Sequence, residues 1–174
     1  MAVREHLLSL ARRLNDGECD SVTFLHALTR EITAQMHCSR ASFWVYEDSS
    51  RSAIRQVCGY DARTDAHQSG LVLRADDYAP YFAAIQGDGL VVASEARLHP
   101  ATACFNDNYH APNDIRSLLD VGIAFNGLPL GLFCCEHTGD IRRWTPMDIK
   151  FLRETGSLIG KALHRAALDD RAAA

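Results

Sequence analysis

Two runs of mainly apolar residues, 117–125 and 128–137, are separated only by Asn126-Gly127. A two-residue type I′ turn needs positive φ at both central positions, and Asn-Gly is the pair that most often supplies them. The sequence therefore predicts an antiparallel hairpin with Phe125 opposite Leu128. Because side chains alternate between the two faces of a strand, this register assigns every later residue of the hairpin to one face.

The register predicts two chemically different faces. With Asp120 opposite Phe133, one face is entirely apolar: Leu119, Val121, Ile123, Leu130, Leu132 and Cys134. The other face mixes apolar with ionisable side chains: Arg116, Leu118, Asp120, Ala124, Phe133, Cys135 and His137. Burying an Arg, an Asp and a His costs several kcal/mol unless each is paired or hydrated. We therefore expect the apolar face to pack against helices and the mixed face to border a partly polar cavity.

Helical periodicity marks both ends of the chain. Apolar residues recur at helical spacing over 3–14 and again over 24–36, which predicts two amphipathic helices. Near the other end, Thr145-Pro146-Met147-Asp148 combines an N-cap, a proline at the first helical position and an acid in the first turn. The helix that begins there can run to about Leu168. Its apolar residues lie close to heptad spacing, which favours a homodimer through the terminal helices: Leu152, Ile159, Leu163 and Ala166.

Between these helices the pattern is mainly that of strands, because β-branched and aromatic residues are frequent. The expected elements are strands over 41–47 and 53–60, around 66–69 and over 90–93, with a helix after Asp76 or Asp77. Residues 94–113 mix helical and loop signals. The order of elements, α-α-β-β-β-α-β-(α)-β-β-α, predicts an α+β fold around an antiparallel sheet.

Composition limits the class of protein. The chain has 174 residues, of which 47% are hydrophobic and 23% charged, and these values are typical of one soluble globular domain. A net charge of −4 argues against a nucleic-acid partner. No apolar run approaches the ~20 residues that span a bilayer, and the N-terminus does not resemble a signal peptide, so we expect a cytoplasmic protein with no membrane partner. None of the six cysteines forms a CxxC pair, which favours reduced, mostly buried thiols.

Several segments, taken in order, resemble a GAF domain of the bacterial sensor-kinase branch: 42–46, 69–71, 115–123, Asn126-Gly127, 131–137 and 143–146. The resemblance spans about 20–168, which leaves 1–19 as an N-terminal amphipathic helix with a linker and 169–174 as a tail. It implies a six-stranded antiparallel sheet with the N- and C-terminal helices on one face. On the other face it implies a pocket for a small molecule, covered by a loop and a helix.

The candidates for lining that pocket come from the strands and from the long connection before the hairpin. They are Trp44, Tyr46, Cys104, Tyr109, His110, Arg116, Asp120, Phe133, Cys135 and His137. Each has an ordinary structural alternative. Arg116 and Asp120 can pair with each other, His137 can be a solvated residue at a strand end, and aromatic residues such as Trp44 can be part of the core.

The resemblance implies a small-molecule-sensing regulatory domain in signal transduction, without catalytic activity. Such a domain signals through its terminal helices to an output domain or to a kinase partner. The residue set of cyclic-nucleotide-binding GAF domains is not recoverable here. The neighbouring Cys-His pair that attaches a bilin is also missing, since Cys104 and His110 are six positions apart. The identity of the ligand and of any cofactor therefore stays open.

Two other functions remain alternatives. The first is a thiol enzyme similar to free methionine-R-sulfoxide reductase, in which one thiolate attacks the sulfoxide and a second thiol resolves the product. Cys104 and Cys135 are the candidates, although the family has two cysteines in the loop that here holds only Cys104. The second is a haem or redox sensor with His110 or His137 as the axial ligand.

Overall fold

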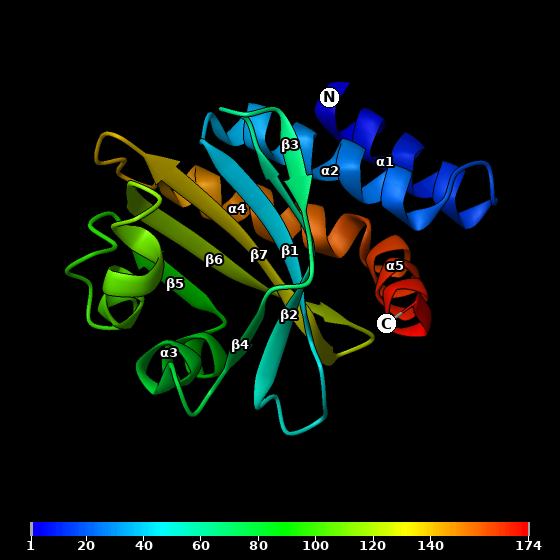
Figure 1. Cartoon of the computed structure of the whole chain (residues 1–174). Helices are drawn as coiled ribbons and strands as arrows, with labels where there is room; N and C mark the ends of the chain where they lie inside the picture. The colour runs from blue at the N-terminus through cyan, green and yellow to red at the C-terminus, as the bar shows by residue number, and fades with distance from the viewer. Residues whose placement is uncertain (1, 174) are drawn as a thin grey trace.

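The structure, a computed structural model, describes residues 2–173. A seven-stranded antiparallel sheet forms the middle layer of the protein. The strand order is β3-β2-β1-β7-β6-β5, and β4 also pairs with β2 (Figure 1). The strands are β1 (Arg40–Tyr46), β2 (Ala53–Asp61), β3 (Ala66–Gln68), β4 (Val72–Arg74), β5 (Leu90–Ala93), β6 (Ile115–Phe125) and β7 (Leu128–Thr138). The sheet has one strand more than the six expected, because the segment after β2 forms two short strands on either side of the corner at 69–71.

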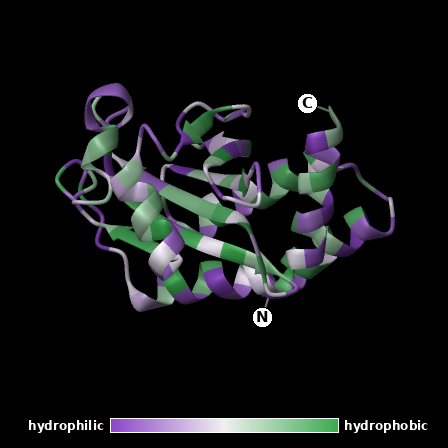
Figure 2. Ribbon diagram, turned by 90° about the horizontal axis from the view of Figure 1, so that it is seen from below, coloured by the Kyte–Doolittle hydropathy of each residue, from purple (hydrophilic) through white to green (hydrophobic). Residues whose placement is uncertain are grey.

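Four helices cover one face of the sheet, and a smaller layer covers the other. The four helices are α1 (Ala2–Asn15), α2 (Ser21–Met36), α4 (Pro146–Leu158) and α5 (Gly160–Ala173). The smaller layer consists of α3 (Ala79–Asp88), the 3-10 turn η1 (Ala103–Phe105) and the π-helical turn η2 (Asn106–His110). Figure 2 shows central strands that are mainly hydrophobic between helices of mixed hydropathy. This arrangement confirms the expected α+β class and the placement of the terminal helices on one face. Among residues 2–173, no helix is both long and apolar enough to cross a bilayer.

Local signals at the ends of the elements are confirmed. Asn126 and Gly127 have φ values of 51° and 78°, as the type I′ turn requires. Thr145 caps α4 in a reciprocal capping box with Asp148, and Pro146 occupies the first turn. Both signals depend only on a few adjacent residues, so both can be predicted from the sequence.

A β-bulge changes the register of the hairpin just beyond its turn. The pairing passes from Ala124–Pro129 to Ile123–Gly131, so Leu130 is an extra residue in β7. Beyond this point every residue of β7 faces the side opposite to the one expected from strict alternation.

The assignment of residues in β7 to faces was therefore wrong. Asp120 lies opposite Cys134 rather than Phe133, and Leu118 lies opposite Glu136 rather than Cys135. Phe133 and Cys135 are buried in the core beneath the four helices. Leu132 and Cys134, which were expected there, lie on the other side of the sheet.

The C-terminal helix is shorter than expected because it is interrupted at Ile159, whose ψ of 17° departs from helical geometry. The helical segment continues as α5 in a new direction (Figure 1). The residues at heptad spacing are fully buried in the domain's own core: Leu152, Ile159, Leu163 and Ala166. The predicted coiled-coil seam is therefore wrong, since these side chains pack within the chain. The segment 169–173, expected to be a tail, belongs to α5.

Candidate functional site

A cavity of about 230 Å³ lies between the sheet and the layer formed by α3, η1 and η2. Its floor consists of residues from β1, β2, β6 and β7, and its cover comes from β4, α3 and the η turns. Most of the lining is aromatic or aliphatic: Trp44, Ile54, Leu71, Val72, Leu73, Tyr78, Tyr81, Phe105, Tyr109 and Leu118. The polar exceptions are Asn108, His110, Asp120, Cys134 and Glu136. An apolar cavity with a few polar groups is the usual composition of a small-molecule site.

Asp120 is the central polar group of the cavity floor. Its side chain is 2% exposed, and the hydroxyl of Tyr81 on α3 donates a hydrogen bond to Oδ2. Its other oxygen, Oδ1, has no hydrogen-bond partner among the described residues. Burial raises the pKa of Asp120 to about 7, and the contacts with the Cys134 thiol and the Tyr81 hydroxyl only partly oppose this rise. Near neutral pH the carboxyl group can therefore either donate or accept a hydrogen bond.

His110, in η2, lies on the same side of the sheet as Asp120 and is completely buried. Neither of its ring nitrogens has a hydrogen-bond partner within residues 2–173. Its ring stands edge-on to Phe105, with 5.6 Å between the ring centroids. Burial lowers the pKa of His110 to about 4, so the ring is neutral at physiological pH. A neutral imidazole offers one donor and one acceptor, and the ring's nearest polar neighbour is the Ala96 backbone, which slightly opposes the fall in its pKa.

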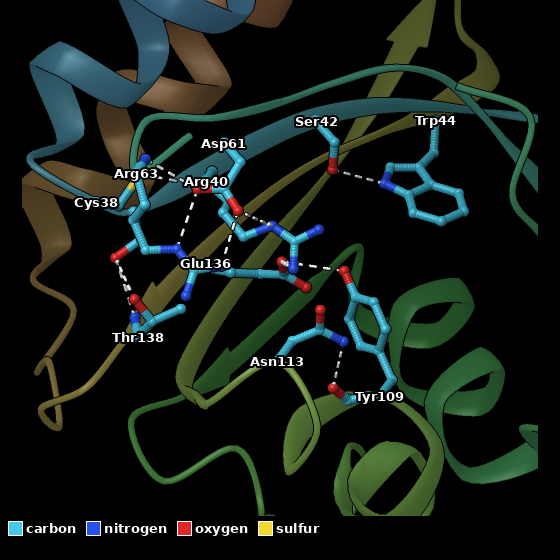
Figure 3. A network of polar contacts seen from close by, with 11 residues as sticks. Cys38, Arg40, Ser42, Trp44, Asp61, Arg63, Tyr109, Asn113, Glu136 and Thr138 are labelled. Carbon is cyan, nitrogen blue, oxygen red and sulfur yellow. Dashed lines mark hydrogen bonds and ion pairs between the residues drawn. The ribbon is translucent and has the colours of Figure 1, made fainter. Parts of the chain in front are cut away.

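A charged network, shown in Figure 3, borders the cavity through Tyr109 and Glu136. Arg40 of β1 lies 3.4 Å from Glu136 Oε2 and 3.6 Å from Asp61 Oδ2. Tyr109 of η2 donates a hydrogen bond of 3.1 Å from its hydroxyl to Glu136 Oε2. Burial raises the pKa of Glu136, and the Arg40 guanidinium opposes that rise. The network joins the cover of the cavity to its floor through Tyr109 and Glu136.

Trp44 and Tyr46 both point from β1 toward the cavity side of the sheet. The Trp44 ring lines the cavity, and its Nε1 donates a hydrogen bond of 2.8 Å to Ser42 Oγ (Figure 3). Tyr46 is buried farther along the same strand face and does not line the cavity. Of the predicted candidates, the structure brings together Trp44, Tyr109, His110 and Asp120 at the cavity wall.

The remaining candidates lie elsewhere. Phe133 and Cys135 are on the helix side of the sheet because of the bulge at Leu130. Arg116 is 42% exposed and pairs with Asp114 at 3.3 Å rather than with Asp120. His137 lies opposite Ser117, and burial together with the nearby Arg142 lowers its pKa.

Cys104 also lies outside the cavity lining, with its thiol 3.6 Å from the carbonyl oxygen of Ala101. Burial raises its pKa, which disfavours the reactive thiolate. Cys135 is fully buried on the opposite side of the sheet. The expected placement of these two thiols on one site is therefore wrong, because the sheet separates them.

Several cavity residues were missed at the sequence level. Cys134 was assigned to the wrong face because strict alternation ignores the bulge, and Glu136, farther along the same strand, was not among the candidates. Tyr78 and Tyr81 were not among the candidates, although both border the cavity. A buried tyrosine hydroxyl on an otherwise apolar helix face needs a hydrogen-bond partner. That requirement could have identified Tyr81 as a residue that faces a polar group.

The unusual pKa of Asp120 predicts a pH-dependent stability. Between about pH 4 and pH 7 the folded chain holds a proton that the unfolded chain has released, so the free energy of unfolding falls as pH rises through this range. Asp120→Asn removes this titration. We expect the variant to gain about 2–3 kcal/mol relative to the wild type between pH 5 and pH 8, measured by urea unfolding at both pH values. Equal pH dependence of the two proteins would contradict a buried, protonated Asp120.

Comparison with known proteins agrees with this architecture. A model of the GAF domain family matches residues 20–163. The phycocyanobilin-bound GAF domain from a cyanobacterial phytochrome superposes with a TM-score of 0.73 at 13% identity, covering 95% of this chain and 96% of that one. The GAF domain from Acinetobacter phosphoenolpyruvate-protein phosphotransferase gives a TM-score of 0.68 at 12% identity, covering 93% and 92%.

A third similar structure is an enzyme. It is the free methionine-R-sulfoxide reductase from Neisseria meningitidis in complex with its substrate, with a TM-score of 0.64, 15% identity and coverage of 96% and 89%. At such identities these structures show a shared fold alone. No curated protein sequence matches the chain. The family model covers most of the sequence, and the sheet, the helix layer and the covered cavity agree with it, so the chain belongs to the GAF domain family.

Proposed function

We propose that this chain is a non-catalytic sensory domain that binds a small molecule in the cavity above Asp120. GAF domains are known for ligand binding and sensing in signalling. The observation that supports a ligand here is the set of polar atoms without partners inside an apolar cavity, namely Asp120 Oδ1 and both ring nitrogens of His110. Buried polar atoms rarely lack a hydrogen-bond partner, so a bound molecule is expected to supply one.

The dimensions and lining of the cavity indicate the class of ligand. A volume of about 230 Å³ is below the roughly 300–1,000 Å³ of sites for drug-sized ligands, which favours a compact molecule. The aromatic walls favour a flat, largely apolar ring. The neutral His110 and the Asp120 carboxyl favour one polar substituent that can donate and accept hydrogen bonds. A small aromatic compound with a hydroxyl or amide group satisfies all three requirements.

The binding test uses para-fluorophenol as a probe of this chemistry, with para-fluoroanisole as the matched compound that cannot donate. We expect saturable binding of the phenol by fluorine NMR and roughly tenfold weaker binding of the anisole, since one hydrogen bond to a buried polar group is worth about 1–2 kcal/mol. Native mass spectrometry of the freshly purified protein complements this test by detecting any small molecule that remains bound.

Leu118→Trp fills the cavity and is expected to abolish binding of the probe. Leu98→Trp is the matched control, because Leu98 is 76% exposed and lies outside the cavity. Equal binding by both variants, or no preference for the phenol, would refute a ligand site above Asp120.

We further propose that α5 carries the output. Arg171 of α5 donates a hydrogen bond of 2.7 Å to the carbonyl oxygen of Tyr46, at the end of the strand that carries Trp44. Asp170 pairs with Arg55 of β2, which also lies 3.3 Å from Glu47. A ligand that shifts β1 would therefore alter the anchoring of α5. Hydrogen exchange in 160–173 is expected to change when para-fluorophenol binds, and unchanged exchange there would argue against this route.

The non-catalytic part of the proposal is supported by the separation of Cys104 from Cys135 by the sheet. An NADPH-coupled assay with free methionine sulfoxide tests it directly. We expect no turnover above that of Cys104→Ser. Turnover that is lost in this variant would instead favour the thiol enzyme.

A homodimer and an output partner, such as a kinase, remain part of the proposal. The interface cannot use the buried heptad residues and would need outward side chains of the helix layer, such as Met147 and Leu168, which are 69% and 50% exposed. Sedimentation at tens of micromolar is expected to show a dimer. A species of 19.2 kDa alone would contradict it.

A further inference from the structure

A second group of chemically reactive side chains lies on the helix side of the sheet, away from the cavity. One ring nitrogen of His26, one of His67 and the sulfur of Cys58 all lie within 4.8 Å of one another. The three residues come from α2, β3 and β2, and α2 and β3 run side by side there (Figure 1). Neither the ligand cavity nor the charged network around Glu136 includes any of them.

Hydrogen bonding and packing bring the two imidazoles together. The rings are stacked, with centroids 3.7 Å apart and an angle of 9° between their planes. His67 Nε2 lies 3.3 Å from the carbonyl oxygen of His26. A carbonyl can only accept, so Nε2 carries the proton in this contact and Nδ1 keeps a free lone pair. A ring nitrogen that donates to a backbone carbonyl is the usual support of a metal-binding histidine.

The chemical types of the three side chains also suit a metal ion. The nearby positive charge of Arg30 is balanced by an ion pair of 2.6 Å with Asp65. Cys58 is 3% exposed, and its sulfur is 3.8 Å from the hydroxyl of Thr29. Two imidazoles and one thiol are a donor set typical of zinc.

We propose that His26, Cys58 and His67 bind one Zn²⁺ ion and thereby link α2 to the β2–β3 hairpin. When the S–Zn bond forms, the Cys58 thiol releases its proton to water, and no electron is transferred. The ion then carries one net positive charge. Three protein ligands leave a fourth position for water or an external ligand.

The surroundings provide room for that fourth ligand. A hollow of about 450 Å³ borders all three residues and also Ser21, Asp169 and Asp170 near the ends of α2 and α5. These two carboxylates favour a cation in the hollow, although Asp169 already accepts a hydrogen bond from Ser21 and Asp170 pairs with Arg55. The ion would therefore lie beside the segment of α5 that we propose to carry the output.

Closing the site requires the two imidazoles to unstack as well as to approach each other, because a metal ion lies in the plane of each ring that binds it. In a tetrahedral site with Zn–N of about 2.0–2.1 Å and Zn–S of about 2.3 Å, neighbouring ligand atoms lie roughly 3.4–3.6 Å apart. The present separations, of at most 4.8 Å, must shrink by no more than about 1.4 Å. His26 and His67 are both only half-buried, so their side chains can rotate to close the site.

The test uses Co²⁺ as a spectroscopic substitute for Zn²⁺, with protein purified without a polyhistidine tag. We expect one equivalent of Co²⁺ to give the visible bands of a tetrahedral site and an ultraviolet thiolate-to-cobalt band, both removed by one equivalent of Zn²⁺. Cys58→Ser should eliminate the thiolate band. His67→Ala should weaken Co²⁺ binding at least tenfold. His67 lies on a short edge strand, so this variant is expected to fold, as checked by circular dichroism.

Matched controls come from residues of the same types outside the group. Cys19→Ser and His6→Ala should leave the cobalt spectrum unchanged, because neither residue lines the hollow or belongs to the group of three. A thiolate band that survives in Cys58→Ser, or equal Co²⁺ affinity in the wild type and His67→Ala, would overturn the site. Binding of para-fluorophenol tests the other side of the sheet, so the two proposals can fail independently.

Discussion

Replacing Gly131 by alanine is expected to abolish the folded state or to lower the free energy of unfolding by more than about 4 kcal/mol. A Cβ atom at this position would lie 1.8 Å from the carbonyl oxygen of Trp44 and 2.8 Å from the Cα of Val45. Both are backbone atoms of β1, and β1 pairs with β7 in the middle of the sheet. Neither can move without breaking that pairing, so no small rearrangement relieves the overlap.

Gly87→Ala provides the matched control for Gly131→Ala. Gly87 lies in α3, has no atom within 4 Å of the corresponding Cβ and has an ordinary negative φ. Alanine should therefore stabilise the chain by about 0.5–1 kcal/mol through its higher helix propensity. Urea unfolding followed by circular dichroism measures both variants. A cooperative transition of Gly131→Ala at the wild-type midpoint would contradict the close approach of β1 and β7.

The second large effect is expected from Arg40→Leu. Arg40 is 8% exposed and is the cation that faces the buried Glu136. Removing it leaves a carboxylate in the interior without a counter-charge, which typically costs about 3–5 kcal/mol. Asp61 keeps Arg63 as its partner at 2.7 Å, so the loss should arise from Glu136. The measurement is urea unfolding at pH 7.5.

A double variant separates the loss of charge balance from the loss of packing. Arg40→Leu combined with Glu136→Gln removes the unpaired charge and retains an acceptor for the Tyr109 hydroxyl. We expect the double variant to recover at least half of the stability lost in Arg40→Leu. If both variants were equally unstable, the contribution of Arg40 would be due to packing of its side chain rather than to the pair with Glu136.

The features that could be predicted from the sequence depend on short-range chemistry. The turn at Asn126-Gly127 and the cap at Thr145 each need only two to four adjacent residues, and both formed as expected. The bulge at Leu130 could not be predicted, because Leu130 is apolar like its neighbours and continues the alternating pattern. Its register is set by pairing with distant strands, which a local pattern does not contain.

The candidate site, like the fold, could be predicted only in part from the sequence. Asp120 was identified because an acid within an apolar strand needs an explanation, and the first strand of the hairpin was assigned to the correct faces. Glu136 was missed because it lies beyond the bulge. The group of His26, Cys58 and His67 could not be predicted either, since the three residues have no metal-binding spacing along the chain and meet only when β3 folds back onto β2 beside α2.

The extra residue in β7 separates the register of the hairpin turn from the register of the rest of the sheet. The two-residue turn sets one alternation of side chains between the two faces of the sheet. The strands that line the cavity have the opposite alternation, and the extra residue Leu130 accommodates the difference. The geometry of the turn and the orientation of the cavity lining are thereby set separately, so a substitution in the turn can leave the side chains around the cavity facing the same way.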